Sequence, residues 1–378
     1  MAHELIQAMP DFANWVWEGK SISAKIVRGA LSPASALFGA IVSRRNTKFD
    51  NAIRERNTKT VRPTVLPALS IGNLTVGGTG KTPVSAWCVQ RLMKLGARPA
   101  VVLRGYGDDE WRVHTLLNRG APVLVAADRL NGIAIASTRG ANCVVLDDAF
   151  QHRQASRAVD IVLVSADRWT GVARLLPSGP FREPMSSLQR ASVVVITAKA
   201  ASPSQISALE RAVFAAAPKS EIAVMRLILG TLHLATTLPT VEADGSMKGR
   251  KIDPSGLLDR PLSWLMGRNI MAVSAIGDPI AFRMQLEAAG ANVTVERFRD
   301  HHTYSAADAE KIARRAESAD GVVCTLKDAV KLAAIWPRVA PPLWYVSQSV
   351  VVERGAPALD RALARVLAVR VATAFNAG

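Results

Sequence analysis

SIGNLTVGGTGKTP, residues 70–83, is the stretch of this sequence that predicts its fold. It follows the apolar run VLPALSI (65–71), which we expect to be a buried strand, and it leads into a helical pattern after Lys81. Its glycines let the backbone curl closely around phosphate oxygens, and the start of the following helix directs free N–H groups at an anion. A strand, a glycine-rich loop and a helix in this order predict a nucleotide phosphate site.

The last two residues of this loop carry the chemistry expected of such a site. Lys81 would reach the β- and γ-phosphates of ATP, and Thr82 would supply a hydroxyl to Mg²⁺. The general pattern G-x-x-x-x-G-K-[ST] has a glycine where this chain has Thr75, but the flanking strand and helix favour nucleotide binding over a structural turn. The residues expected to contact the nucleotide are Thr75, Val76, Gly77, Gly78, Thr79, Gly80, Lys81 and Thr82.

A pair of acids at the end of another apolar run extends this site. Asp147 and Asp148 follow the run in VVLDDAFQHR. In an α/β sheet the ligand crevice lies at the carboxyl ends of the strands, where a carboxylate can hold Mg²⁺ against the loop threonine. Either aspartate alone could instead cap the next helix, but the pair together with the loop favours a metal site.

Strand-like and helix-like segments alternate along most of the chain. This alternation predicts an α/β fold with a doubly wound, mostly parallel sheet of the P-loop NTPase type. The further apolar runs read as buried strands are PAVVL near 101, PVLVA near 124, CVVLD near 145, DIVLV near 162 and SVVVI near 194.

The alternation weakens from about residue 229, where ADGS indicates a turn between two extended runs, and it resumes near 268. We therefore expect four parts. These are an N-terminal helical segment over 1–45, a P-loop core over 46–228, an extended connector over 229–267 and a smaller α/β lobe over 268–378.

The composition restricts the partners of this chain without choosing among them. Its 378 residues carry a formal net charge of +16, so the surface should attract phosphorylated substrate, acidic lipid or nucleic acid. The sequence has no recognition helix, zinc finger or aromatic-basic RNA motif, so we expect no nucleic-acid partner, and no obligate protein partner is evident. Cys88, Cys143 and Cys324 lie far apart in apolar stretches, which predicts buried packing residues and no disulfide framework or zinc cluster.

The N-terminal region has features of a helix at a membrane surface. It lacks the basic start and apolar block of a signal peptide, and no apolar run approaches the roughly 20 residues needed to cross a bilayer. We expect a helix with Ser32 as its N-cap and Pro33 as its first residue. An apolar stripe with basic ends suits an anionic membrane surface, although a helix that faces the core would show the same stripe. The stripe comprises Val27, Leu31, Ala34, Phe38 and Ile41, and the flanking basic residues are Arg28, Arg44, Arg45 and Lys48.

Several segments together resemble those of the tetraacyldisaccharide 4'-kinases of Gram-negative bacteria. They are spread over most of the chain in the order that the family has. The segments are IGNLTVGGTGKTP (71–83), RGYG (104–107), DDAFQH (147–152), LLPSGPFREP (175–184), DHHTYS (300–305) and TLKDAVKL (325–332).

The resemblance implies transfer of the ATP γ-phosphate to the 4'-hydroxyl of an acylated glucosamine disaccharide 1-phosphate, which gives lipid IVA. It also implies a peripheral or monotopic enzyme with an N-terminal membrane-binding helix, at the cytoplasmic face of the bacterial inner membrane. The fold implied is a P-loop core with a smaller second lobe that closes over the nucleotide.

The resemblance further assigns roles to single residues. The catalytic base of the family is an aspartate after RGYG, which works with a histidine of the D-H-H motif. In this chain the aspartate is Asp109, or Asp108 in another register, and its partner is His301 or His302. A carboxylate oriented by an imidazole can accept the proton of a sugar hydroxyl as the new O–P bond forms. Two arginines inside matching motifs, Arg104 and Arg182, are expected to contact phosphates of the substrate, or else to form structural ion pairs.

Three positions depart from the family pattern: Trp111, Ala149 and Leu326, and the stretch after RGYG is short. An alternative function is that of a membrane-surface P-loop ATPase without a lipid acceptor. The loop of such ATPases typically reads K-G-G-x-G-K-T, and this chain has Val76 in place of the first lysine.

Overall fold

The computed structural model describes residues 12–105, 107, 109–242, 247–248, 259–300 and 302–375. The strands are β1 (Ala68–Asn73), β2 (Pro99–Leu103), β3 (Val123–Val125), β4 (Cys143–Asp147), β5 (Val159–Ser165), β6 (Val193–Ala198), β7 (Glu221–Leu234), β8 (Thr240–Val241), β9 (Met247–Lys248), β10 (Asp259–Arg260), β11 (Asn269–Ser274), β12 (Asn292–Arg297), β13 (Gly321–Thr325) and β14 (Leu343–Arg354). The α-helices with assigned bounds are α2 (Ile22–Arg54), α3 (Lys81–Lys94), α4 (Glu110–Leu117), α5 (Arg129–Thr138), α6 (Pro203–Ala216), α7 (Pro279–Ala288), α8 (Ala306–Arg315), α9 (Leu326–Leu332) and α10 (Ala356–Phe375).

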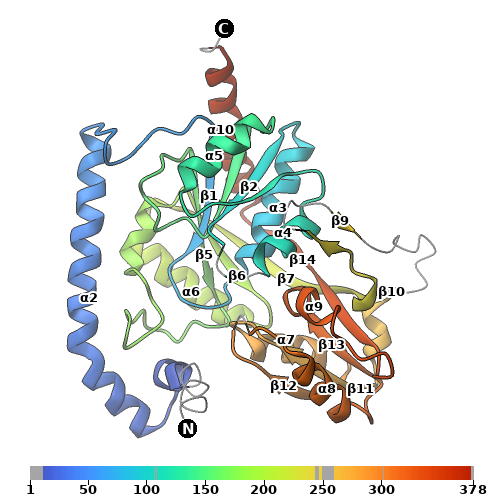
Figure 1. The fold of residues 1–378 in the computed structure, drawn as a ribbon. Coiled ribbons are helices and arrows are strands. Elements are labelled where there is room, and N and C mark those ends of the chain that lie inside the picture. The colour runs from blue at the N-terminus through green and yellow to red at the C-terminus, as the bar shows by residue number, and fades with distance from the viewer. Residues whose placement is uncertain are drawn as a thin grey trace.

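Twelve of these strands form one continuous sheet (Figure 1). Its order is β12-β11-β13-β14-β7-β6-β5-β1-β4-β2-β3, with β10 paired to β7. All neighbours are parallel except the β7–β14 and β7–β10 pairs. The predicted α/β fold with a mostly parallel sheet is therefore confirmed.

Alternating side chains of the parallel strands pack against helices on opposite faces of the sheet. Leu69 and Ile71 of β1 lie in a buried cluster with α3 and α10, whereas Ala68 lies in a cluster with α5 on the other face. Helix α6 packs on that second face against β5 and β6. This two-sided burial explains why the strands are almost continuously apolar in sequence. It also confirms the buried positions predicted for Cys88 and Cys143.

The two halves of the sheet are joined by its two longest strands. Along the β7–β14 pair, Val224 lies opposite Arg354 at one end and Leu234 lies opposite Trp344 near the other. The boundary predicted at 228/229 falls inside β7, and α10 packs back against the first half through Leu359 and Leu363. One sheet contains strands of the predicted core, connector and smaller lobe. The four-part division remains a prediction. The ADGS turn predicted in the connector lies outside the described residues.

Helix α2 is 33 residues long and corrects the predicted helix start at Ser32 and Pro33. Ser21 is the N-cap, and its hydroxyl accepts a hydrogen bond from the Ala24 amide at 3.2 Å. Pro33 lies inside the helix, where the Ser32 hydroxyl donates to the carbonyl of Arg28 at 3.0 Å. A serine hydroxyl can form such a hydrogen bond within a helix, so the pair Ser32 and Pro33 does not mark the start of α2.

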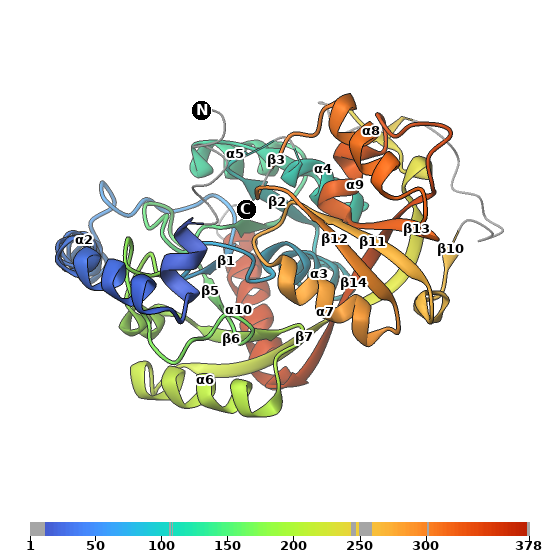
Figure 2. The ribbon, with the colours of Figure 1, turned by 90° about the horizontal axis from the view of Figure 1, so that it is seen from below.

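The apolar face that α2 exposes differs from the predicted stripe. Val27, Leu31 and Phe38 are half-buried, whereas the large side chains that are at least 60% exposed are Ile22, Ile26, Leu37 and Ile41. An 18-residue window of α2 has a mean hydropathy of 1.4, which is enough, by length and composition alone, for a membrane-crossing helix. The expectation that no segment reaches this threshold was therefore wrong. Figure 2 shows α2 along one side of the molecule, away from α8 and α9.

One buried carboxylate fastens α2 to the body of the protein. Glu183 is fully buried and accepts hydrogen bonds from Asn46 and Arg190, each at 2.7 Å, and from Arg45 at 3.3 Å. Burial acts to raise the pKa of Glu183, but Arg190 and these hydrogen bonds outweigh it and hold the pKa below its ordinary value. Two of these three donors, Arg45 and Asn46, lie on α2. The position of the helix therefore depends on the charge of Glu183.

We predict that Glu183→Ala lowers the free energy of unfolding by about 3 kcal/mol, because it leaves a buried arginine and a buried amide without their partner. Urea denaturation at pH 7 measures this loss. The control is Glu221→Ala, which breaks an exposed pair with Arg361 and should change the free energy of unfolding far less than Glu183→Ala does.

The same network sets a pH dependence. The depressed pKa of Glu183 means that its contribution is present above the unfolded value of 4.5 and is lost as the pH falls through the folded pKa. The difference in stability between wild type and Glu183→Ala should therefore shrink in acid. A difference that stays constant down to pH 3 would contradict this account.

Candidate functional site

The glycine-rich loop joins β1 to α3 and takes up backbone angles that require glycine. Gly77 and Gly80 have φ of +100° and +83°. A Cβ at Gly80 would lie 2.3 Å from the Cδ1 atom of Leu227 on β7, so the Leu227 side chain would have to shift for any other residue. The loop thus packs with its backbone directly against neighbouring elements, as a phosphate-binding turn must.

Polar side chains outside the motif hold the loop in shape. The Asn73 amide donates to the Thr79 hydroxyl at 2.8 Å, and the Thr197 hydroxyl donates to the Thr79 carbonyl at 2.8 Å. Lys81 donates to Asn73 Oδ1 at 3.3 Å. The sequence did not single out Asn73, the last residue of β1, or Thr197, which only the fold brings to the loop.

The loop opens into a cavity of about 1120 Å³ between the two halves of the sheet. All eight predicted loop residues, Thr75 to Thr82, line it. The core contributes acids and bases at the carboxyl ends of its strands, and the second half contributes α7 and α9. The other charged lining residues that matter below are Arg104, Glu110, Arg129, Asp147, Asp148, Arg182, Lys199, Asp278, Asp300 and Lys327.

Asp147 ends β4 almost fully buried and is held by two donors. Its Oδ1 accepts from the Ser85 hydroxyl at 2.7 Å, and its Oδ2 lies 3.2 Å from His114 Nε2. The Asn118 amide donates to His114 Nδ1 at 3.2 Å, so Nε2 carries the proton that His114 donates to Asp147. Burial acts to raise the pKa of Asp147, but His114, Ser85 and the charge of Lys81 outweigh it and hold the pKa below its ordinary value. The carboxyl is therefore ionised at neutral pH.

Asp148 faces the loop and has a left-handed backbone, with φ of +46°. Its carboxylate lies 3.7 Å from Lys81 Nζ and 3.0 Å from Arg182 Nη2. Burial raises the pKa of Asp148, but these two cations outweigh it and lower the pKa below its ordinary value. The positive φ falls on Asp148 and not on the following Ala149, which is fully buried, so this departure from the family pattern needs no unusual backbone at residue 149.

The candidate base Asp109 lies behind the cavity wall. It is 2% exposed, and Lys331 of α9 lies 3.6 Å from its Oδ2. The next residue, Glu110, lines the cavity and pairs with Lys327 of α9 at 3.7 Å. Burial acts to lower the pKa of Lys327, but Glu110 and other nearby acids raise it. Two acids of α4 thus face two lysines of α9 across the cleft.

The candidate partner His302 is committed to other groups in this structure. Its Nε2 lies 3.2 Å from Asp308, and its ring stacks on Phe298 at 4.8 Å between centroids. The neighbouring Asp300 lines the cavity. His301 and Asp108, the alternatives considered from the sequence, lie outside the described residues.

Arg104 and Arg182, the two expected phosphate contacts, both line the cavity. Arg182 is already engaged with Asp148 and with the carbonyl of Asn73 at 3.1 Å, while Arg104 is exposed. Two lining residues were missed by sequence reasoning. Arg129 donates to the carbonyl of Asp147 at 3.1 Å, and Lys199 donates to the carbonyl of Gly78 at 3.2 Å.

Comparison with known proteins gives consistent matches over nearly the whole chain. The family model described as LpxK, tetraacyldisaccharide-1-P 4'-kinase, matches residues 27–368. A tetraacyldisaccharide 4'-kinase of Anaeromyxobacter sp. (strain K) is 33% identical over 368 residues, which cover 90% of this chain and 92% of that protein. One of Chlorobium chlorochromatii (strain CaD3) is 34% identical over 325 residues, covering 77% and 79%.

Among solved structures, that of LpxK from Aquifex aeolicus in complex with ATP matches with a TM-score of 0.64 at 24% identity. The match covers 90% of this chain and 99% of that one. At this identity the structural match establishes the shared fold, including the second half of the sheet.

Proposed function

Since the chain belongs to the tetraacyldisaccharide-1-P 4'-kinase family, and so phosphorylates the 4'-position of tetraacyldisaccharide 1-phosphate with ATP in lipid A synthesis, we propose that the cavity at residues 75–82 is where the transfer occurs. The observation that carries this proposal is the lining of one cavity by the whole loop, Asp147 and Asp148. The alternative of a lipid-surface ATPase without an acceptor is not favoured by the family match.

In the proposed arrangement the triphosphate of ATP lies along the loop, with Lys81 at the β- and γ-phosphates. Both cations now on Asp148, Lys81 and Arg182, are within reach of the loop and can turn to phosphate oxygens. Arginine's planar fork suits such oxygens. Arg104, which is exposed at the cavity, is proposed to contact a phosphate of the acceptor.

The acids fit a magnesium ion. Thr82, Asp147 and Asp148 supply hydroxyl and carboxylate oxygens to one cavity, which are the ligands that Mg²⁺ takes, together with water and substrate phosphates. Among the residues that the structure describes, no group of three or more His, Cys, Asp or Glu side chains could hold a metal by itself. When bound, the ion would neutralise charge on the β- and γ-phosphates. Ser85 and His114 orient Asp147 for this task.

Asp109 is the proposed acceptor of the proton from the 4'-hydroxyl. The hydroxyl oxygen forms a bond to the γ-phosphorus as the bond from that phosphorus to the β–γ bridging oxygen breaks, ADP leaves, and the proton passes to the carboxylate. Asp109 reaches the cavity only when its contact with Lys331 is loosened, because it is buried in this conformation. A histidine of the D-H-H segment, His301 or His302, is proposed to orient it.

The first prediction is that the wild-type protein transfers labelled phosphate from Mg-ATP to detergent-solubilised tetraacyldisaccharide 1-phosphate, whereas Lys81→Ala does not. Removing the ammonium deletes a charge that stabilises the transferring phosphoryl group, so we expect a loss of at least 100-fold in kcat/KM with an unchanged thermal transition. Acceptor-independent hydrolysis at the rate of transfer would reinstate the ATPase alternative.

The second prediction separates two neighbouring acids. Asp109→Asn should lower kcat by about 10²- to 10⁴-fold, the usual worth of a general base, with little change in the KM for ATP. Glu110→Gln is the matched control on the same helix turn and should retain most of kcat. The reverse result, a large loss in Glu110→Gln and near-normal turnover in Asp109→Asn, would move the base to Glu110.

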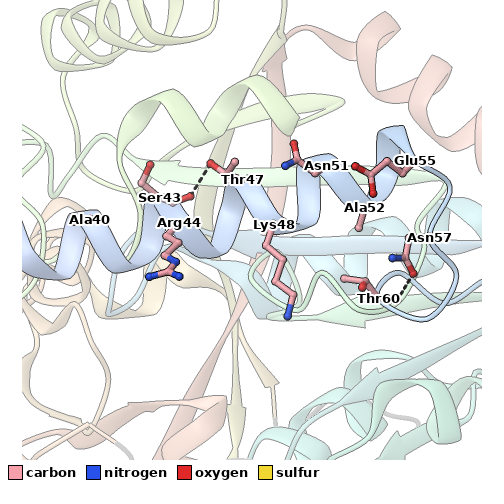
Figure 3. Close-up of a pocket in the computed structure, with 10 residues that line it drawn as sticks. All are labelled: Ala40, Ser43, Arg44, Thr47, Lys48, Asn51, Ala52, Glu55, Asn57 and Thr60. Carbon is pink, nitrogen blue, oxygen red and sulfur yellow. Dashed lines mark hydrogen bonds between the residues drawn. The ribbon is translucent and has the colours of Figure 1, made fainter.

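We also propose that α2 seats the enzyme on the cytoplasmic face of the bacterial inner membrane. The exposed side chains Ile22, Ile26, Leu37 and Ile41 share one face of α2, followed on that face by Arg44 and Lys48. Arg44 and Lys48 extend from the same side of the helix into a hollow of about 810 Å³ (Figure 3). Apolar side chains next to lysine and arginine suit the boundary between acyl chains and anionic head groups.

The third prediction tests this face. Replacing Ile26 and Leu37 together by glutamine should reduce the partition coefficient onto vesicles with anionic lipid at least tenfold, because each buried apolar side chain contributes about 1.5–3 kcal/mol. Ile53→Gln is the control, since Ile53 is 54% exposed on the opposite face of the same helix. Equal sedimentation of all three proteins with vesicles would exclude this face as the contact.

A further inference from the structure

Arg168 lies just after β5 and brings three distant parts of the chain together. Its Nε and Nη2 donate to Glu18 Oε1, at 3.0 and 2.5 Å, and Nη2 also donates to Asn14 at 3.3 Å. Its Nη1 donates to the carbonyl of Gly277 at 3.1 Å. Glu18 and Asn14 belong to the helical segment over residues 12–18, and Gly277 belongs to the loop between β11 and α7.

The Gly277 end of this contact rests directly on the phosphate loop. A Cβ at Gly277 would lie 2.4 Å from the Gly78 nitrogen, and a Cβ at Gly77 would lie 2.2 Å from Arg168 Nη1. The guanidinium, Gly277 and the two loop glycines are therefore packed without room for a further atom. A shift of Arg168 has to displace the loop, the second half of the sheet, or both.

A second cation holds the same junction but has no link to the N-terminal segment. Lys199 donates to the Gly78 carbonyl at 3.2 Å and to Asp278 at 2.7 Å. Lys199 follows β6, so it fixes the junction to the core alone. Arg168 differs because two of its three partners lie on residues 12–18.

That N-terminal segment has its own exposed apolar surface. Phe12 and Trp15 are 54% and 37% exposed, and their rings lie 5.6 Å apart. The segment is joined to the start of α2 by Arg28, which donates to the carbonyls of Val16 and Gly19 at 2.6 and 2.8 Å. The segment, α2 and Arg168 thus form a continuous chain of contacts that ends on the phosphate loop.

We propose that Arg168 is a positioning residue through which the N-terminal segment sets the geometry of the phosphate loop, so that ATP binding depends on Glu18. This inference rests on the proposed function of the loop as the ATP site. Glu18 and Asn14 fix the plane of the guanidinium, and the guanidinium holds Gly277 against Gly77 and Gly78. The N-terminal segment is then part of the nucleotide site as well as part of the surface facing the lipid.

The test is the equilibrium dissociation constant for a non-hydrolysable Mg-ATP analogue, measured without acceptor on the full-length protein in detergent. We expect Glu18→Gln to raise it about two- to five-fold, which corresponds to a partly exposed charge pair. Arg168→Gln should raise it at least tenfold, because the Gly277 carbonyl and the loop both lose their neighbour. The double variant should bind no more weakly than Arg168→Gln alone, since Glu18 acts only through the arginine.

Two further readouts separate positioning from anchoring or general destabilisation. Glu18→Gln should leave vesicle sedimentation and the KM for the acceptor within twofold of wild type, because its carboxylate is paired with Arg168 and does not line the cavity. The control is Asp360→Asn, which breaks the exposed 3.2 Å pair with Arg91 on α3, the helix that follows the loop, and should not change ATP affinity.

Unchanged affinity for the analogue in Glu18→Gln, or an effect confined to the KM for the acceptor, would overturn the proposal. If Arg168→Gln does not fold, Glu18→Gln alone decides. Failure of the proposed function is distinguishable, because it would show as absent transfer by wild-type protein that still binds the nucleotide.

Discussion

The approach of backbone to backbone at the phosphate loop is the constraint on which the rest of the structure depends. An added Cβ at Gly277 would meet the backbone nitrogen of Gly78 at 2.4 Å, and one at Gly80 would meet the Cδ1 atom of the Leu227 side chain at 2.3 Å. Only glycine permits such approaches. The Gly277 contact therefore places a loop of the second half of the sheet directly against the anion site. Asn73 and Thr197 also hold the loop through their hydrogen bonds to Thr79.

Electrostatic balance around the loop follows from this packing. The chain carries a net charge of +16, yet its cavity acids are each matched to donors before any phosphate arrives. Asp148 pairs with Lys81 and Arg182, while Asp147 accepts hydrogen bonds from Ser85 and His114. A triphosphate competes for the first pair and not for the second, since Ser85 and His114 are fully buried and do not line the cavity. We infer that nucleotide binding releases Asp148 and leaves Asp147 as it is, which gives the two neighbouring acids different parts in the site.

The sequence predicted the sheet and the loop well because both depend on local patterns. Continuous apolar runs marked β2, β4, β5 and β6 correctly, and the glycine spacing marked the phosphate loop. The start of α2 was missed because Ser32 and Pro33 satisfy an N-cap pattern whose outcome is decided by contacts with distant residues such as Glu183. For the site, His114 and Arg168 carried no signal in sequence, since their partners Asp147 and Asn14 lie 33 and 154 positions away and meet them only in the fold. The roles of Asp109 and the histidines stay predictions that resemblance supplied.

The short stretch between β2 and α4 limits where Asp109, the proposed general base, can lie. Six residues separate Leu103 from Glu110, and six residues span at most about 20 Å, so α4 must begin near the carboxyl edge of the sheet. The positions of Asp109 and Glu110 at the cleft are thereby set by the first half of the sheet. Both of their lysine partners lie on α9, one helical turn apart, so a movement that separates one pair separates the other. The position of α9 therefore decides whether Asp109, the proposed proton acceptor, is shielded or uncovered.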